Sequence, residues 1–193
     1  MKVLILYNEP GDDALVEDQD VLDQRDAVRA SLRALDHHTE CLACTLNLES
    51  VRSSVQASMP DIVFNLVESL GGTDRLMSLA PLLLDALGVP YTGAQSRSIL
   101  NTSDKLQAKR RLIAAGLPTP AWKAAGAMDG QSIAHEVGNP VGRWILKPVW
   151  EHASFSMDDA AVVSEVDPES LQTRLLVREK QFQRPFFAEQ FIE

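Results

Sequence analysis

The sequence has few cysteines, no long apolar run and no excess of basic residues. Its formal net charge is −9, which argues against nucleic acid or an anionic membrane as a partner, because both are bound by basic surfaces. No segment approaches the roughly 20 apolar residues of a membrane span, and the opening MKVLILY is too short for the apolar core of a signal peptide. We therefore expect a cytoplasmic protein.

The cysteines form the motif CLAC, with Cys41 and Cys44 close to His37 and His38. This spacing suggests a zinc or redox site. However, the sequence lacks a second pair at zinc-finger spacing and the proline and aromatic context of a thioredoxin site. Since cysteine is often buried as a small hydrophobe, we expect both residues to be structural.

What is present is the composition of a globular protein of one or two domains: 193 residues, 45% hydrophobic and 23% charged.

The first half alternates strands and helices. Asp20 is a possible helix cap, Gly88 ends the last helix, and Pro81 is expected to kink that helix or mark a new start. This alternation predicts a parallel sheet covered by helices, with ligands beyond the carboxyl ends of its strands. The strands are expected at 2–7, 39–43 and 61–67, the helices at 21–35, 48–58 and 74–88, and the polar strand-end residues are Asn8, Glu9, Asn65 and Glu68.

The pattern changes after residue 95. The segment TSDKLQAKRRLIAAGLPTP predicts a helix that Ser103 or Asp104 caps and Gly116 ends. Short strands follow in AWKAA, RWILKPV, AAVVSEV and PFFAEQFIE, with a helix in PESLQTRLLVREK. The sequence thus predicts an α/β domain over 1–95 and a second, α+β domain over 96–193.

Lys147 lies inside the apolar run WILKPV. Burying an ammonium without an anionic partner costs several kcal/mol or shifts its pKa. We therefore expect Lys147 to meet an anion, which could be a carboxylate or a ligand.

Several blocks in order resemble the D-alanine–D-alanine ligase group of the ATP-grasp superfamily. They are FNLVESLGGTDRLMSLAPLLLDALGVPYTGA, SDKLQAKRRLIAAGLPTP, WILKPVWEHASFSM and FFAEQFIE. The resemblance covers about residues 60 to 193 well and the first 60 loosely. It implies a Rossmann-like pre-ATP-grasp domain, followed by the first lobe of an ATP-grasp fold.

The resemblance also implies an ATP site. Lys105 and Lys147 would reach the phosphates, and the loop from Glu151 to Met157, with Ser154, would close over them. The adenine would meet the Glu189 side chain and backbone groups of the next residues, Gln190, Phe191 and Ile192. Magnesium is implied as well, with ligands expected beyond Glu193, so that this chain is expected to be inactive alone.

The implied activity is that of an ATP-dependent carboxylate–amine ligase, which joins small molecules through an acylphosphate and is often a homodimer. The alternative is a non-catalytic nucleotide-binding or interaction module. The sequence departs from the family in three ways. Glu17 is only a weak counterpart of the residue that orients the first substrate, and in the phosphate loop Ala153 replaces a serine and Ser156 replaces a glycine. The largest departure is that the sequence stops at FIE, before the rest of the fold that the resemblance implies.

Overall fold

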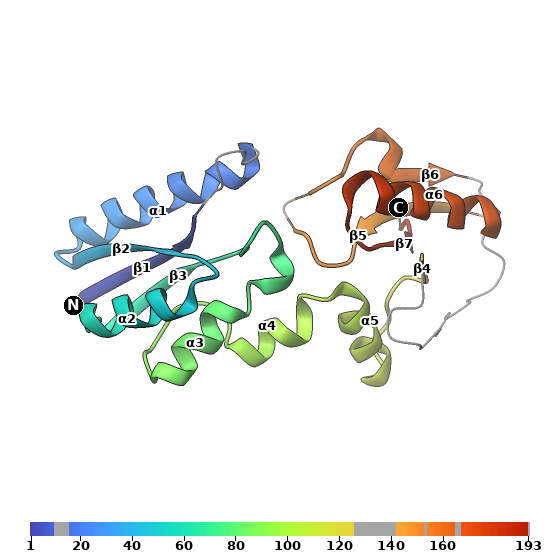
Figure 1. The fold of residues 1–193 in the computed structure, drawn as a ribbon. Helices are drawn as coiled ribbons and strands as arrows, with labels where there is room; N and C mark the ends of the chain where they lie inside the picture. Colours follow the sequence, from blue (N-terminus) through green and yellow to red (C-terminus); the bar gives the residue numbers. More distant parts are fainter. Residues whose placement is uncertain (10–15, 126–141, 153, 165–166, 193) are drawn as a thin grey trace. The chain divides into compact units, whose positions relative to one another are not determined.

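The computed structural model describes residues 1–9, 16–125, 142–152, 154–164 and 167–192. The chain divides into two compact units, Met1–Ser103 and Asp104–Glu193, whose elements are labelled in Figure 1. Helix α4 (Ser96–Thr102) belongs to the first unit. The backbone N–H of Ser96 donates to the Tyr91 hydroxyl (3.1 Å), which connects the helix to that unit.

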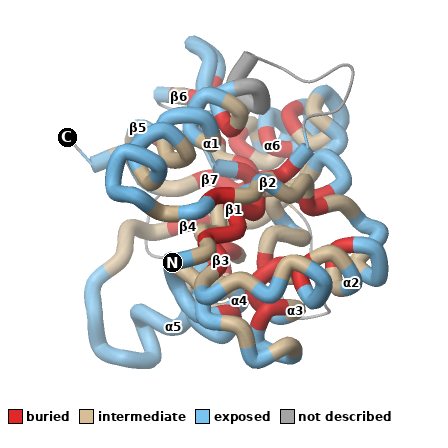
Figure 2. Tube along the Cα trace, turned by 90° about the vertical axis from the view of Figure 1, so that its left-hand side faces the viewer, coloured by how far each residue is buried: buried red, intermediate tan, exposed pale blue. Residues whose placement is uncertain are grey.

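The first unit contains a parallel sheet of three strands, as predicted. Strand β1 (Lys2–Asn8) lies between β2 (His38–Cys44) and β3 (Ile62–Leu66) and pairs in parallel with both. The connections contain helices α1 (Val16–Ala34) and α2 (Leu48–Ser58). Strand β1 is central and its residues are mostly buried (Figure 2), in agreement with its continuous apolar sequence.

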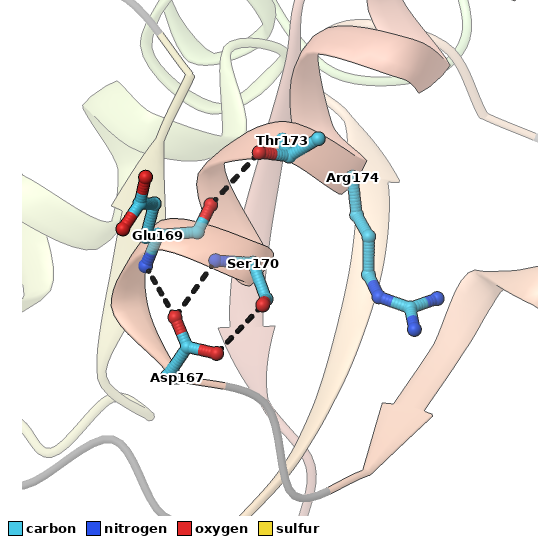
Figure 3. Close-up of a pocket in the computed structure, with 5 residues that line it drawn as sticks. All are labelled: Asp167, Glu169, Ser170, Thr173 and Arg174. Atoms are coloured by element: carbon cyan, nitrogen blue, oxygen red, sulfur yellow. Dashed lines mark hydrogen bonds between the residues drawn. The ribbon is translucent and has the colours of Figure 1, made fainter.

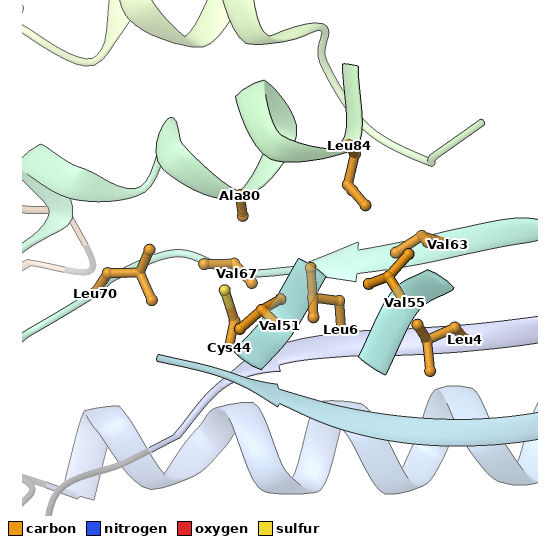
Figure 4. Packing of buried hydrophobic residues seen from close by; sticks show 10 residues of the cluster. All are labelled: Leu4, Leu6, Cys44, Val51, Val55, Val63, Val67, Leu70, Ala80 and Leu84. Atoms are coloured by element: carbon orange, nitrogen blue, oxygen red, sulfur yellow. The ribbon is translucent and has the colours of Figure 1, made fainter. Parts of the chain in front are cut away.

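Helices cover both faces of this sheet. Figure 1 shows α1 on one side and α2 with α3 (Leu79–Leu87) on the other. On the second side Leu4 and Leu6 of β1 pack against Val51 and Val55 of α2, as Figure 4 shows. Successive side chains of a strand point to opposite faces, so β1 contributes to both layers.

Two expectations about helix ends need refinement. Asp20 is not a cap, because α1 begins at Val16 and Asp20 lies inside it. The expected helix over 74–88 is instead a 3₁₀ turn, Asp74–Leu76, followed by α3, with Pro81 in the first turn of α3. Proline is tolerated there because the first-turn N–H groups have no partner within the helix. Gly88 ends α3 at φ 67°, as predicted.

The second unit is an antiparallel sheet with helices, also as predicted. Its strand order is β4-β7-β5-β6. Asp104 caps α5 by accepting a hydrogen bond from the N–H of Gln107 (2.9 Å). None of the helices that the structure describes in either unit is both long and apolar enough to cross a membrane. The elements of the second unit are α5 (Lys105–Ala114), β4 (Trp122–Ala124), β5 (Arg143–Pro148), β6 (Val162–Ser164), α6 (Pro168–Phe182) and β7 (Phe186–Gln190).

The two faces of this second sheet differ in what they bury. One face packs against Leu171 and Leu175 of α6 through an apolar cluster that includes Trp144, Leu146, Phe186 and Ala188. On the other face, Leu106 of α5 clusters with Trp122 and Phe187. Because side chains alternate along a strand, residues next to the α6 cluster in sequence point toward α5.

Candidate functional site

Lys147 and Glu189 lie on neighbouring strands and on the α5 face of the sheet. Lys147 is opposite Phe187, and Glu189 is opposite Ile145. The register therefore places both charged side chains on one face, where the Lys147 ammonium pairs with Oε2 of Glu189. Of the two anions that the sequence left open for Lys147, the structure provides the carboxylate. With 31% of its side chain exposed, Lys147 is half-buried rather than enclosed by the apolar run.

A second lysine, which the sequence analysis did not identify, completes this cluster. The Lys109 ammonium pairs with Oε1 of Glu189 and donates a hydrogen bond to Oγ1 of Thr119 (2.7 Å). It also lies 5.0 Å from the ring centre of Trp122. A signal was available, because Lys105 and Lys109 are four residues apart and so share one face of α5.

The two lysines control the charge of Glu189. Burial by itself would raise the pKa of its carboxyl, but the hydrogen bonds and positive charges of Lys109 and Lys147 outweigh that effect and hold the pKa below its ordinary value. Glu189 is thus an anion at neutral pH, and the cluster of two lysines and one carboxylate carries a net positive charge. A site of this kind favours an anionic ligand.

Lys105 lies close to the start of the loop that was expected to cover phosphates. Its ammonium donates to the backbone carbonyl of Glu151 (2.6 Å), and its backbone N–H donates to the carbonyl of Val149 (3.1 Å). The side chain of Glu151 is buried, with its Oε1 3.0 Å from Nε of Arg184. In this structure Lys105 therefore holds the first residue of the loop.

The rest of the described loop is attached to α6 by an aromatic contact. The ring of Phe155 meets that of Phe182 edge to face, with centroids 5.5 Å apart. Ser154 and Ser156 adopt positive φ angles of 61° and 62°. This left-handed conformation favours glycine, which gives a physical reason for a glycine at the position of Ser156 in the ligases that the sequence resembles. Ala153 lies outside the described residues.

Two backbone N–H groups near the end of β7 form hydrogen bonds within the protein. The backbone N–H of Gln190 donates to the carbonyl of Ala121 (2.8 Å), and that of Phe191 donates to Arg143 (2.9 Å). These two N–H groups already donate hydrogen bonds to carbonyl groups of the protein. Ile192 is the remaining residue of the predicted adenine edge, and it is 65% exposed.

In the first unit, the polar residues at the strand ends hold the backbone. Oδ1 of Asn8 accepts from the N–H of Glu68 (3.2 Å), and Oδ1 of Asn65 accepts from the N–H of Val67 (3.2 Å). Glu17 lies in α1, but its side chain is outside the described part of the structure. These contacts do not by themselves define a ligand site.

The two cysteines of the CLAC motif differ in burial. Cys44 is buried, which raises the pKa of its thiol to about 11, whereas Cys41 is exposed. Among the residues that the structure describes, no three His, Cys, Asp or Glu side chains come together as metal ligands would. We assign no magnesium ligand within this part of the chain.

A surface hollow at the start of α6 lies apart from the lysine cluster in sequence (Figure 3). Its lining residues are Asp167, Glu169, Ser170, Thr173 and Arg174. The Asp167 carboxylate accepts hydrogen bonds from the N–H groups of Glu169 (3.0 Å) and Ser170 (2.9 Å). Its oxygens thus cap the helix, so the hollow is explained by local structure.

Comparison with solved structures identifies the fold that holds this site. A D-alanine–D-alanine ligase from Bacillus anthracis, in complex with ATP, matches all of the chain with a TM-score of 0.68 and 18% identity, over 59% of its own length. VanG D-Ala:D-Ser ligase from Enterococcus faecalis also matches all of the chain, with a TM-score of 0.65 and 15% identity, over 63% of its own length. The chain therefore has the ATP-grasp fold of these ligases.

Sequence comparison is more specific. D-alanine–D-alanine ligase from Moorella thermoacetica is 34% identical over 149 residues, which are 73% of this chain and 45% of that protein. The ligase from Ralstonia pickettii is 31% identical over 170 residues, 86% of this chain and 46% of that protein. No protein-family model matches the chain. The chain is thus a homologue of D-alanine–D-alanine ligases, and it spans less than half the length of these two relatives.

Proposed function

We propose that this chain is part of an ATP-dependent carboxylate–amine ligase, in which the α5 face of the second unit binds nucleotide. The observation that carries the proposal is the cluster of Lys147, Lys109 and Glu189 in a chain homologous to D-alanine–D-alanine ligases. The cluster has a net positive charge, and 31% of the Lys147 side chain is exposed. Both properties suit a site for phosphate oxygens.

The residues have distinct roles in this proposal. Lys147 binds phosphate oxygens, and Lys105 positions the loop that begins at Glu151, which brings backbone N–H groups close to the phosphates. The exposed Ser154 contributes from the same loop. At the other end of the site, Glu189 accepts a hydrogen bond from the adenine amino group, while Ile192 supplies a backbone donor and Gln190 and Phe191 supply carbonyl groups rather than their N–H groups.

The reaction that this site would serve begins with phosphate transfer from ATP to a substrate carboxylate, and an amine then displaces phosphate to form an amide. The lysines counter the negative charge that moves between the reacting oxygens, and the loop keeps water from the activated carboxyl. From the name of the relatives, we expect both substrates to be amino acids such as D-alanine. Magnesium would add positive charge at the phosphates, from ligands that we do not assign in this chain.

Calorimetric titration with ATP tests the nucleotide site. We expect weak binding by this chain, on the order of millimolar, and loss of binding in Lys147→Met. The matched control is Lys180→Met, which removes an exposed lysine from the last turn of α6. Equal ATP affinity of Lys147→Met and Lys180→Met would contradict the proposed site.

A phosphate-release assay on the full-length natural protein tests the reaction. Release that depends on both ATP and D-alanine supports the ligase. ATP binding without phosphate release under any amino acid tested supports the alternative, a nucleotide-binding module.

A further inference from the structure

We propose that Lys109 is a positioning residue that keeps the Glu189 carboxylate charged and in place, so that Lys147 can leave this carboxylate for an anionic ligand. The ligand class, a nucleotide phosphate, rests on the proposed function. The division of roles between the two lysines rests on the contacts of the cluster itself.

The two lysines hold Glu189 in different ways. Lys109 is fixed by Glu189, by Thr119 and by the ring of Trp122, and only 6% of its side chain is exposed. Lys147 meets Glu189 from the neighbouring strand and is 31% exposed. Lys109 therefore cannot turn toward solvent without losing several contacts, whereas Lys147 loses one ion pair.

A carboxylate that is only 15% exposed is costly to leave without a cation. If Lys147 were its sole partner, an entering phosphate would have to break that pair and leave a partly buried charge behind. Lys109 removes this cost, because Oε1 of Glu189 keeps its own cation while Oε2 is released. Lys147 is then released from Glu189 and can pair with the anionic ligand.

Within the part of the chain that the structure describes, no other charged group shifts the pKa of Glu189. The charges that act on its carboxyl are Lys109 from α5 and Lys147 from β5. On its other side, strand β4 places Trp122 opposite Glu189 in the sheet register, and this residue does not titrate. Loss of Lys109 should therefore be compensated in one of two ways, by retention of Lys147 or by protonation of Glu189.

Titration of the Glu189 carboxyl by NMR, without nucleotide, tests the division of roles directly. In Lys147→Met we expect the pKa of Glu189 to stay below its ordinary value, because Lys109 remains. In Lys109→Met we expect a higher pKa than in Lys147→Met, because the remaining cation is half-exposed and has fewer contacts. A pKa that rises as much or more in Lys147→Met would overturn the proposal.

Lys109→Met could prevent folding, so a second variant tests the same point. Thr119→Val keeps both lysines and removes one contact that fixes the Lys109 ammonium. We expect it to raise the pKa of Glu189 by a smaller amount in the same direction. An unchanged pKa of Glu189 in Thr119→Val would overturn the assignment.

The exchange itself is tested by calorimetry with ATP over a range of pH, in buffers of different ionisation enthalpy. Wild type sets the baseline for the protonation of ATP. Relative to it, Lys109→Met should take up an additional proton on binding. Its affinity should then fall as the pH rises, by up to about tenfold per pH unit between the pKa of Glu189 in the free protein and the higher pKa of the released carboxyl in the complex. The double variant Lys109→Met/Glu189→Gln should lose this extra pH dependence, whereas its persistence there would overturn the mechanism. If wild type binds no ATP, the proposed function fails, and the ligand-free titration still decides the roles of the lysines.

Discussion

Lys109 of α5 and Glu189 of β7 are 80 residues apart in the sequence and form an ion pair with the lysine almost fully buried. The pair connects the first helix of the second unit to the sheet. Beside it, Leu106 of α5 packs in a cluster with Trp122 and Phe187. The ion pair and the apolar cluster therefore both hold α5 on one face of the sheet.

Removal of Lys109 should destabilise the protein as well as alter the site. Breaking a buried ion pair by removing one partner typically costs about 3–5 kcal/mol. Because Lys147 still pairs with Glu189, we expect Lys109→Met to lower the free energy of unfolding by about 2–3 kcal/mol, somewhat less than that range. Urea denaturation measures this loss. The neighbouring exposed residue gives the control, Arg110→Met, for which a change within about 0.5 kcal/mol is expected.

Helix α6 offers a second stability test with adjacent leucines. Leu175 is fully buried against the sheet, whereas Leu176 is 52% exposed. We expect Leu175→Ala to reduce the free energy of unfolding by about 2–5 kcal/mol, through lost apolar burial and the cavity that remains. Leu176→Ala should cost less than about 1 kcal/mol. Similar losses in the two variants would contradict the packing of α6 against this face.

Much of the fold could be predicted because local patterns and tertiary structure agree. The helix over 48–58 has the bounds that its sequence indicates, and Gly88 ends α3 where a left-handed residue is needed. The short strands of the second unit were found from their apolar runs. The exact start of α1 was not predicted, since Asp20 is compatible with a cap and also with the interior of a helix.

The site was predicted less completely, for a physical reason. The sequence shows that Lys147 needs an anion, but the identity of that anion depends on strand register, which places Glu189 beside it. In the sequence, nothing distinguishes Lys109 from an ordinary lysine on the surface of a helix. Only the packing of α5 on the sheet, which no local pattern specifies, buries it against Thr119 and Trp122.

Glu40 should make the stability of the first unit depend on pH in the acid range. Hydrogen bonds from Ser58 and Lys2 lower the pKa of its carboxyl from 4.5 to about 2. A lowered pKa in the folded state stabilises the protein above the ordinary pKa, and this contribution is lost as the pH falls toward about 2. The difference in unfolding free energy between wild type and Glu40→Gln should therefore shrink between these two values. In a Ser58→Ala background the change with pH should be smaller; an unchanged pH dependence there would contradict the role of Ser58.

Ser156 provides the last prediction, because its conformation and its side chain are both unfavourable. Its φ of 62° is left-handed, which costs a residue other than glycine about 1–2 kcal/mol. Its hydroxyl oxygen is buried and meets no hydrogen-bond partner among the described residues. Ser156→Gly removes both penalties, while the greater freedom of glycine in the unfolded chain opposes folding by roughly 0.5–1 kcal/mol.

The balance for Ser156→Gly should be a stabilisation of about 1 kcal/mol, measured by urea denaturation. Ser53→Gly is the matched control, since Ser53 is an exposed residue within α2, and there glycine should destabilise by about 0.5 kcal/mol through its lower helix propensity. A β-branched residue tests the opposite direction. Ser156→Val should destabilise the protein, because valine is strongly disfavoured at positive φ. If Ser156→Gly and Ser53→Gly lose stability equally, the left-handed conformation of Ser156 does not control the stability of this loop.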